Sequence, residues 1–151
     1  LRRFPPAGAP VFSCVHRPVI RSLRRGTESA FPSAPTPGEI RRHLASPEIK
    51  TLVFSGIADN TEVERSAAAL GATVAGRVGF ADHHAYTGGD LSKVVEAARK
   101  AGAEILLTTE KDAVRLPTAE PLPLDSIVIG VEIDFGAHAA PFLDWVESGL
   151  I

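Results

Sequence analysis

The chain has 151 residues, of which 44% are hydrophobic and 23% charged, and its formal net charge is −2 at neutral pH. This length and apolar content suit one folded domain with a core of ordinary size. No apolar run reaches the roughly 18 to 20 residues that a membrane-spanning helix needs, and no signal peptide opens the chain, so we expect a soluble protein. A single cysteine, Cys14, excludes an internal disulfide, and the five histidines form no zinc motif with it. A reducing compartment is the default expectation.

Charge is unevenly distributed along the chain. The first 42 residues contain eight arginines and two glutamates, whereas the remainder is acidic. Such a basic segment could contact anionic lipid head groups or a phosphorylated ligand, although a solvated arginine-rich surface is the simpler explanation. The chain also begins at Leu1 and contains no methionine, which is typical of a piece of a longer protein.

Residues 1–46 are expected to form a basic, proline-rich β-hairpin or linker. Residues 11–15 and 18–23 are short β-type stretches on either side of His16 and Arg17. The prolines at positions 32, 35 and 37 then interrupt regular structure. We therefore place a boundary after residue 46 and expect an α/β domain over residues 47–151.

Strands and helices alternate from residue 51 onward. The pattern predicts strands over residues 51–54, 72–80, 103–108 and 127–135, and helices over residues 61–70, from about residue 90, and over residues 141–147. Such βαβ repetition favours a parallel sheet with helices on both faces, a three-layer Rossmann-like α/β fold.

Local sequence chemistry supports the two longer predicted helices. Thr61 and Glu64 have the spacing of a capping box at the start of the first helix, and Gly71 can end it in a left-handed conformation. Gly102 is placed to end the second helix in the same way. Each helix has one apolar face, formed by Val63, Ala67 and Leu70 in the first and by Leu91, Val94, Val95 and Ala98 in the second.

Chemistry in open α/β sheets gathers at the carboxyl ends of the strands, which selects the loops over residues 56–60, 82–89 and 108–115. The second of these loops is the densest in reactive groups, in the order Asp82, His83, His84 and Tyr86. A histidine can move a proton near neutral pH, and a nearby carboxylate can orient its ring. The alternative is an ordinary polar turn in which Thr87 or Asp90 caps the next helix.

The third loop follows a very apolar strand and carries the run from Thr108 to Leu116. Its lysine and arginine could meet phosphate oxygens while Thr109 caps a turn. The alternative is a local ion-pair network on a short helix, formed by Glu110, Lys111, Asp112 and Arg115.

Residues 71–78 imitate the glycine spacing of a phosphate-binding P-loop, but we reject that interpretation. Arg77 stands where the lysine is needed, and Val78 where a serine or threonine is needed. A P-loop also runs from strand to helix, whereas this segment leaves a helix and enters a strand. The chain therefore offers no evident cradle for the phosphates of ATP.

Two motifs together resemble the tetraacyldisaccharide 4'-kinase family. They are Val-Gly-Phe-Ala-Asp-His-His-Ala-Tyr-Thr at residues 78–87 and Leu-Leu-Thr-Thr-Glu-Lys-Asp-Ala-Val-Arg-Leu at residues 106–116. Their order and their separation by one helix match the family, as do His-Arg-Pro at residues 16–18 and Phe-Ser-Gly-Ile-Ala at residues 54–58. The resemblance covers nearly the whole chain but only the C-terminal part of the family, so the P-loop domain would lie before Leu1.

The resemblance implies a lipid kinase. The family transfers the γ-phosphate of ATP to the 4'-hydroxyl of a tetraacylated disaccharide 1-phosphate, a lipid A precursor, at the cytoplasmic face of the inner membrane in Gram-negative bacteria. ATP and Mg²⁺ would be bound mainly by the missing P-loop domain, so this piece would be inactive alone and would hold no cofactor or metal itself. Its partners would be the lipid precursor, the membrane surface and the missing domain, and no nucleic acid.

The resemblance also implies roles for particular residues. His83 would be the catalytic contribution of this part, acting with an aspartate of the missing domain that activates the sugar hydroxyl, and Asp82 would orient it. His84 and Tyr86 are weaker candidates for binding substrate or lining the cleft, and the same placement is carried over to Thr109, Glu110 and Lys111. One departure concerns residues 56–60, because the family usually has a proline soon after Gly-Ile-Ala and this chain does not.

Two other functions are kept as alternatives. Asp82, His83 and His84 could belong to a metal-dependent phosphoesterase of the Asp-His-His type, but two-metal hydrolysis needs further carboxylates, and only Asp59 and Glu110 lie at neighbouring strand ends. The third function is a non-catalytic α/β module that binds a ligand.

Overall fold

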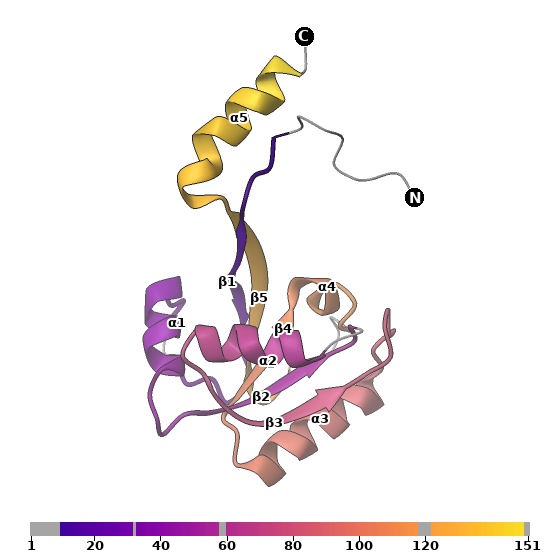
Figure 1. Cartoon of the computed structure of the whole chain (residues 1–151). Helices are drawn as coiled ribbons and strands as arrows, with labels where there is room; N and C mark the ends of the chain where they lie inside the picture. Colours follow the sequence, from indigo (N-terminus) through magenta and orange to yellow (C-terminus); the bar gives the residue numbers. More distant parts are fainter. Residues whose placement is uncertain (1–9, 32, 58–59, 118–121, 150–151) are drawn as a thin grey trace. The chain divides into compact units, whose positions relative to one another are not determined.

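The structure is a computed structural model that describes residues 10–31, 33–57, 60–117 and 122–149. Its elements follow one another along the chain as shown in Figure 1. They are β1 (Val15–Arg24), α1 (Pro37–Leu44), β2 (Lys50–Ser55), α2 (Asn60–Ala69), β3 (Thr73–Gly79), α3 (Gly88–Ala101), β4 (Ile105–Thr109), α4 (Glu110–Ala113), β5 (Asp125–Asp134), the 3-10 helix η1 (Gly136–His138) and α5 (Ala139–Ser148).

Five strands form one sheet in the order β1-β5-β4-β2-β3. β2 pairs in parallel with β3 on one side and with β4 on the other, and β4 pairs in parallel with β5. The parallel α/β sheet predicted from the βαβ repetition is thereby confirmed. Because β2, β3 and β4 are neighbours with one direction, their carboxyl ends meet at a single edge.

The chain divides into two compact units. The larger unit comprises residues 18–130, and the smaller one combines the residues up to 17 with those from 131 onward. β1 and β5 each contribute residues to both. The boundary expected after residue 46 lies inside the larger unit, between α1 and β2.

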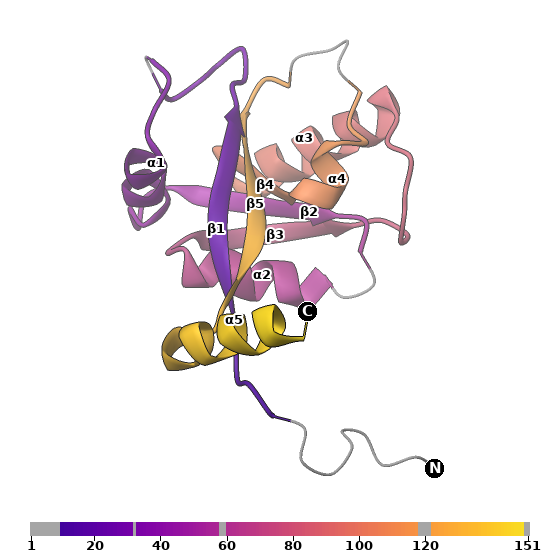
Figure 2. The same cartoon turned by 90° about the horizontal axis from the view of Figure 1, so that it is seen from above.

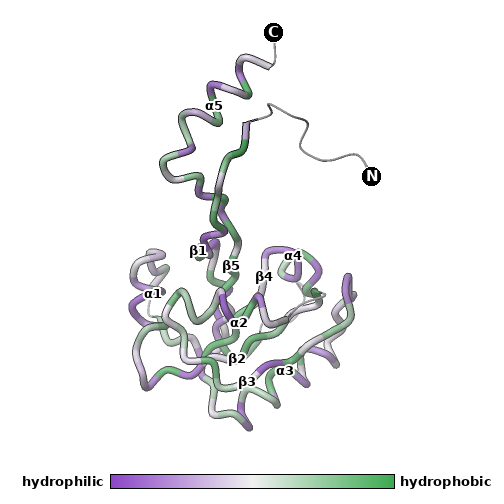
Figure 3. Tube along the Cα trace, in the orientation of Figure 1, coloured by the Kyte–Doolittle hydropathy of each residue, from purple (hydrophilic) through white to green (hydrophobic). Residues whose placement is uncertain are grey.

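Helices cover both faces of the sheet in the larger unit (Figures 1 and 2). α1 and α2 pack on one face, in a cluster that includes Leu44, Val53 and Leu107. α3 packs on the other face, in a cluster that includes Phe54 and Leu106. Neighbouring residues of one strand thus point to opposite layers, as the pleat of a strand requires. The alternation of apolar and polar residues along α3 is visible in Figure 3.

The predicted helix faces and helix ends are confirmed, with one exception at a cap. Val63, Ala67 and Leu70 are all buried, as are Leu91, Val94 and Ala98, while Val95 is half-buried. Gly71 has φ +96° after α2 and Gly102 has φ +65° after α3, conformations that glycine adopts without strain. The exception is Thr61, which lies inside α2 because the helix already begins at Asn60, and the residue before it is outside the described ranges.

Helix α1 was not predicted, and the expectation of irregular structure around Pro37 was wrong. Pro37 occupies the first position of the helix, where its missing N–H is not needed and its fixed φ is already helical. Thr36 and Glu39 form a capping box, in which Thr36 Oγ1 accepts from Glu39 N at 3.3 Å and Glu39 Oε2 accepts from Thr36 N at 2.7 Å. The helix then buries Ile40 and Leu44 against the sheet.

Of the two short N-terminal stretches expected on either side of His16 and Arg17, the second joins these two residues in one strand that begins at Val15, whereas residues 11–14 lie outside it. Within the larger unit, Arg21 lies beside Gly130, and Gly26 N donates to Asp125 Oδ1 at 2.9 Å. The partners on β5 thus descend in number as β1 ascends, so the two strands are antiparallel. Pro18 is tolerated because β1 is the edge strand, where one row of N–H groups has no neighbour to pair with.

The smaller unit is held together by aromatic side chains. Phe12 contacts Phe142 with ring centroids 5.4 Å apart and Trp145 at 5.7 Å, and Phe135 stacks on Phe142 at 4.2 Å. α5 nevertheless contains no buried residue. Of the described residues, none belongs to a helix that is both long and apolar enough to cross a membrane.

Candidate active site

Three loops come together at the carboxyl edge of β2, β3 and β4. They begin at Gly56, at Phe80 and at Glu110, each directly after its strand. Phe80 N donates to Ser55 O at 2.9 Å, and His83 N donates to Gly56 O at 3.3 Å, so the second loop is hydrogen-bonded to the start of the first. The rule that placed the candidate chemistry at these three strand ends therefore selected neighbouring loops.

His83 lies at the tip of the second loop with its side chain 77% exposed. Its backbone has φ +60°, and among the described residues it is the only one other than glycine with a positive φ. This left-handed conformation costs a side chain of this kind about 1 to 3 kcal/mol and persists only where the surroundings enforce it.

Two charged groups contact the ring of His83. Arg115 Nη2 lies 2.9 Å from His83 Nδ1, and Asp82 Oδ2 lies 3.7 Å from His83 Nε2. A guanidinium can only donate, so Nδ1 must accept with its lone pair, and the proton of the neutral ring is then on Nε2. Asp82 also accepts from the His83 backbone N–H through Oδ1 at 3.0 Å. The ring is thus held by Arg115 at Nδ1 and has a carboxylate near Nε2, while the orienting role of Asp82 stays a prediction.

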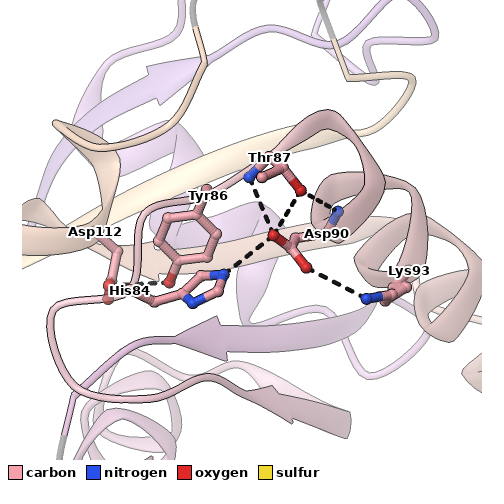
Figure 4. A network of polar contacts seen from close by, with 6 residues as sticks. All are labelled: His84, Tyr86, Thr87, Asp90, Lys93 and Asp112. Atoms are coloured by element: carbon pink, nitrogen blue, oxygen red, sulfur yellow. Dashed lines mark hydrogen bonds and ion pairs between the residues drawn. The ribbon is translucent and has the colours of Figure 1, made fainter.

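His84 points into a different network, shown in Figure 4. Its Nε2 lies 3.1 Å from Asp90 Oδ2, and its ring stacks on Phe80 with centroids 4.7 Å apart. Asp90 closes the capping box of α3 with Thr87, which is therefore the cap of that helix. Hydrogen bonds from the Thr87 side chain, followed by the contact with His84, hold the pKa of Asp90 far below its usual range.

Tyr86 is buried, with 6% of its surface exposed. Its hydroxyl donates to Asp112 Oδ1 at 3.0 Å, and its ring meets Phe54 and Phe80 edge to face. Burial, and then the negative charge of Asp112, raise the pKa of Tyr86 well above its usual value. This phenol supports the loop from inside, and its placement in a substrate cleft stays a prediction.

The first three side chains of the Thr-Glu-Lys-Asp run have different surroundings. Thr109 caps α4, accepting at Oγ1 from Asp112 N at 3.2 Å and donating from the same oxygen to Asp112 Oδ2 at 2.7 Å. Glu110 pairs with Arg21 of β1 at 3.3 Å, across Gly130, where no side chain intervenes. Lys111 is exposed. The local ion-pair network considered from the sequence is therefore not what the run forms.

Sequence reasoning missed the residue that connects the three loops. Asp112 is fully buried, and Gly56 N donates to its Oδ1 at 3.0 Å, in addition to the bonds from Tyr86 and Thr109. A carboxylate directly after a buried strand, in a run that otherwise suits the surface, was the available signal. The placement of Thr109, Glu110 and Lys111 at a cleft stays a prediction.

The described residues contain no group of three histidine, cysteine, aspartate or glutamate side chains that could hold a metal ion. Asp59, which the phosphoesterase alternative would use, lies outside the described residues. The segment with P-loop spacing leaves α2 through a turn at Gly71 and enters β3, as predicted.

Fold and site together define an α/β domain with a histidine-bearing polar site at the carboxyl edge of its parallel sheet. The family model described as tetraacyldisaccharide-1-P 4'-kinase matches residues 17–150. The chain belongs to this tetraacyldisaccharide 4'-kinase family, as its two motifs indicated.

Similar proteins agree with that assignment. A tetraacyldisaccharide 4'-kinase of Desulfatibacillum aliphaticivorans is 39% identical over 148 residues, which are 96% of this chain and 38% of that protein. One from Methylobacterium nodulans is 36% identical over 141 residues, covering 91% of this chain and 37% of that protein. The chain thus spans less than two fifths of the length of these relatives.

A solved structure is also similar. It is an "apo" form of LpxK from Aquifex aeolicus, described as in complex with ATP. It is 21% identical, with a TM-score of 0.49, over 89% of this chain and 35% of that one.

Proposed function

We propose that this chain is the part of a tetraacyldisaccharide 4'-kinase that brings His83 to the reaction. The complete enzyme would transfer the γ-phosphate of ATP to the 4'-hydroxyl of tetraacyldisaccharide 1-phosphate in lipid A biosynthesis. It would work as a peripheral protein at the cytoplasmic face of the inner membrane. Family membership over residues 17–150, together with an exposed, oriented histidine at a strand end, carries the proposal.

His83 acts here as a hydrogen-bond donor. Because Arg115 occupies the lone pair of Nδ1, the neutral ring carries its proton on Nε2, and Asp82 Oδ2, 3.7 Å away, is too far to accept that proton in a hydrogen bond. This Nε2–H group suits a carboxylate, which it would orient and stabilise while the carboxylate accepts the proton of the sugar hydroxyl. Such a carboxylate would come from the remainder of the protein. Asp82 holds the ring from the other side.

ATP and Mg²⁺ would be bound by the remainder of the protein, where they supply the phosphoryl group and neutralise its charge. The residues of this chain do not suit that task. The segment with P-loop spacing enters a strand, so it offers no helix N-terminus to a phosphate. The part of the chain that the structure describes also gathers no three metal-binding side chains. We therefore propose that this chain alone has no kinase activity.

The test is His83→Ala in the complete protein, assayed by transfer of labelled phosphate from ATP to tetraacyldisaccharide 1-phosphate. We expect kcat to fall about 100-fold to 1,000-fold, the usual cost of removing a preorganised hydrogen-bond donor. The melting temperature should stay unchanged, because the side chain is 77% exposed. His138→Ala, which removes an exposed histidine from η1, is the matched control. Full activity in His83→Ala would refute the assigned role.

A further inference from the structure

Asp112 has a side chain that binds the first two strand-end loops and itself belongs to the third. Its Oδ1 accepts from Gly56 N in the first loop and from Tyr86 Oη in the second, both at 3.0 Å. Its Oδ2 accepts from Thr109 Oγ1 at 2.7 Å, and Asp112 itself belongs to α4 in the third loop. A buried carboxylate needs several donors to replace water, and here they are drawn from separate segments of the chain.

Two of these bonds lead to the loop that carries His83. The Gly56 peptide donates to Asp112 with its N–H, and its carbonyl accepts from His83 N at 3.3 Å. Tyr86 is three residues beyond His83 in the same loop. On the other side, Arg115 lies three residues beyond Asp112 and reaches His83 Nδ1 at 2.9 Å. The backbone, the loop and the ring of His83 are therefore all positioned from Asp112.

The backbone of His83 requires such support. Its φ of +60° is unfavourable for a residue with a side chain, so a loop left free would relax out of it. Gly56 shows how closely the loops approach, because a Cβ there would lie 3.0 Å from Ala81 O and 3.2 Å from both Asp112 Oδ1 and His84 Cβ. Glycine at this position lets the first loop fit between the other two.

We propose that Asp112 is the positioning residue of this site, which fixes the conformation of the His83 loop and the contact between Arg115 and the His83 ring. The proposal rests on the function proposed for His83. It assigns the Thr-Glu-Lys-Asp run to the support of His83 through its aspartate, and it makes no use of Lys111 or Glu110.

Asp125 is the matched control, because we expect it to have a structural role alone. Asp125 is also buried, 1% exposed, and also has three donors, namely Gly26 N, Ser29 Oγ and Ala30 N. It lies at the opposite, amino end of the parallel strands, where Ile105 of β4 is its partner. Asp112→Ala and Asp125→Ala therefore remove equivalent groups from the two ends of the sheet.

Asp112→Asn is the conservative variant. An asparagine can keep its carbonyl oxygen toward Gly56 N and the Tyr86 hydroxyl, and its amide can donate to Thr109 Oγ1, since a hydroxyl also accepts. The ties between the loops would then survive without the charge. Tyr86→Phe is the milder variant, because it removes one hydrogen-bond donor to Asp112 and leaves the aromatic ring in place.

All variants are to be made in the complete protein and measured in two ways. The first is kcat and KM for ATP and for tetraacyldisaccharide 1-phosphate. The second is the ¹⁵N NMR signal of the His83 ring, assigned by its loss in His83→Gln, which reports the tautomer and the contact with Arg115. The melting temperature of each variant gives the structural cost.

We expect Asp112→Ala to lower kcat about 100-fold, the loss typical of a reacting group displaced by about 1 Å, with little change in KM for ATP. The His83 ring signals should shift toward those of a free imidazole that exchanges between tautomers. Asp125→Ala should lower the melting temperature comparably and leave both the ring signals and kcat near wild type. Asp112→Asn should restore kcat relative to Asp112→Ala, and Tyr86→Phe should fall between them.

Equal loss of kcat in the two alanine variants, or unshifted His83 ring signals in Asp112→Ala, would overturn the positioning role. Should Asp112→Ala fail to fold, Tyr86→Phe decides by the same ring signals. A complete protein without 4'-kinase activity would instead refute the proposed function, and the ring signals would still test the positioning of His83.

Discussion

Each end of the parallel sheet has a buried aspartate that accepts several hydrogen bonds, and the two ends differ in which segments of the chain supply the donors. At the amino end, Asp125 collects two backbone N–H groups and one hydroxyl from residues 26–30, a single nearby turn. At the carboxyl end, Asp112 collects its donors from three loops that are up to 56 residues apart in sequence. The difference teaches that burial and hydrogen-bond count do not distinguish a structural carboxylate from one that supports a site. The two kinds of carboxylate are distinguished by which segments of the chain supply the donors.

The sheet between the two ends gives the largest expected effect. Leu107 lies in β4, fully buried, and Leu107→Asp would place a carboxylate there without donors. The desolvation cost of several kcal/mol is comparable to the whole stability of a domain, which is about 5 to 15 kcal/mol. We expect circular dichroism and limited proteolysis of the complete protein to show this part unfolded. Val114→Asp, at a position 84% exposed, is the control and should fold normally.

A native-like Leu107→Asp protein would contradict the sheet assignment, and with it both ends of the comparison.

Two glycines allow the two ends to be perturbed separately. A Cβ at Gly26 would lie 2.5 Å from the Leu124 carbonyl carbon and also overlap Pro123 O, which are backbone atoms that cannot move aside easily. Gly26→Ala should therefore cost about 1 to 3 kcal/mol in free energy of unfolding. Gly56→Ala meets milder contacts and should cost about 1 kcal/mol. Denaturant unfolding measures both.

Activity should follow the opposite order. Gly56→Ala pushes against the loop that carries His83, so we expect kcat to fall about tenfold, less than for a full displacement of 1 Å. Gly26→Ala should leave kcat unchanged once the folded fraction is taken into account. If kcat followed stability in both variants, the two ends would not be functionally distinct.

The smallest expected effect concerns Asp90, the carboxylate in the capping box of α3. The pKa of Asp90 is lowered in the folded protein, first by hydrogen bonds from Thr87. A lowered folded pKa gives stability that is present above the unfolded value of about 3.9 and is lost as the pH falls through the folded value. Asp90→Asn should therefore lower the melting temperature at neutral pH, and the difference from wild type should shrink below about pH 4.

Melting curves recorded between neutral and acidic pH check this prediction, with Glu104→Gln, an exposed carboxylate outside the network, as control. A difference that stays constant into the acid range would show that the charge of Asp90 does not matter and that only its shape does.

Regular elements were predictable because their periodicity is strong. β2 to β5, α2, α3 and α5 agree with the sequence to within about two residues, since each has a repeating apolar pattern in its sequence. α1 was missed because a proline was interpreted as a breaker, although the first turn of a helix accepts it. The signal that would have found it was Thr36 with Glu39 three residues later.

The sequence predicted where the candidate site lies but not which residues contact one another there. The strand-end rule selected the right loops, because parallel strands bring their carboxyl ends to one edge. The contacts of Arg115 with His83 and of Asp112 with Gly56 join residues 32 and 56 positions apart. No local pattern encodes such pairs, since they depend on how the loops pack after the sheet has formed.

The position of β1 has a consequence for how the chain is made. Its partner in the sheet, β5, begins about a hundred residues later, so during synthesis β1 emerges long before the strand that it must join. An unpaired strand can associate with other nascent chains, and charged side chains together with proline discourage this. Arg17, Arg21 and Arg24 and Pro18 all lie on β1. Part of the positive charge near the start of the chain thus discourages β1 from associating with other nascent chains before β5 has been synthesised.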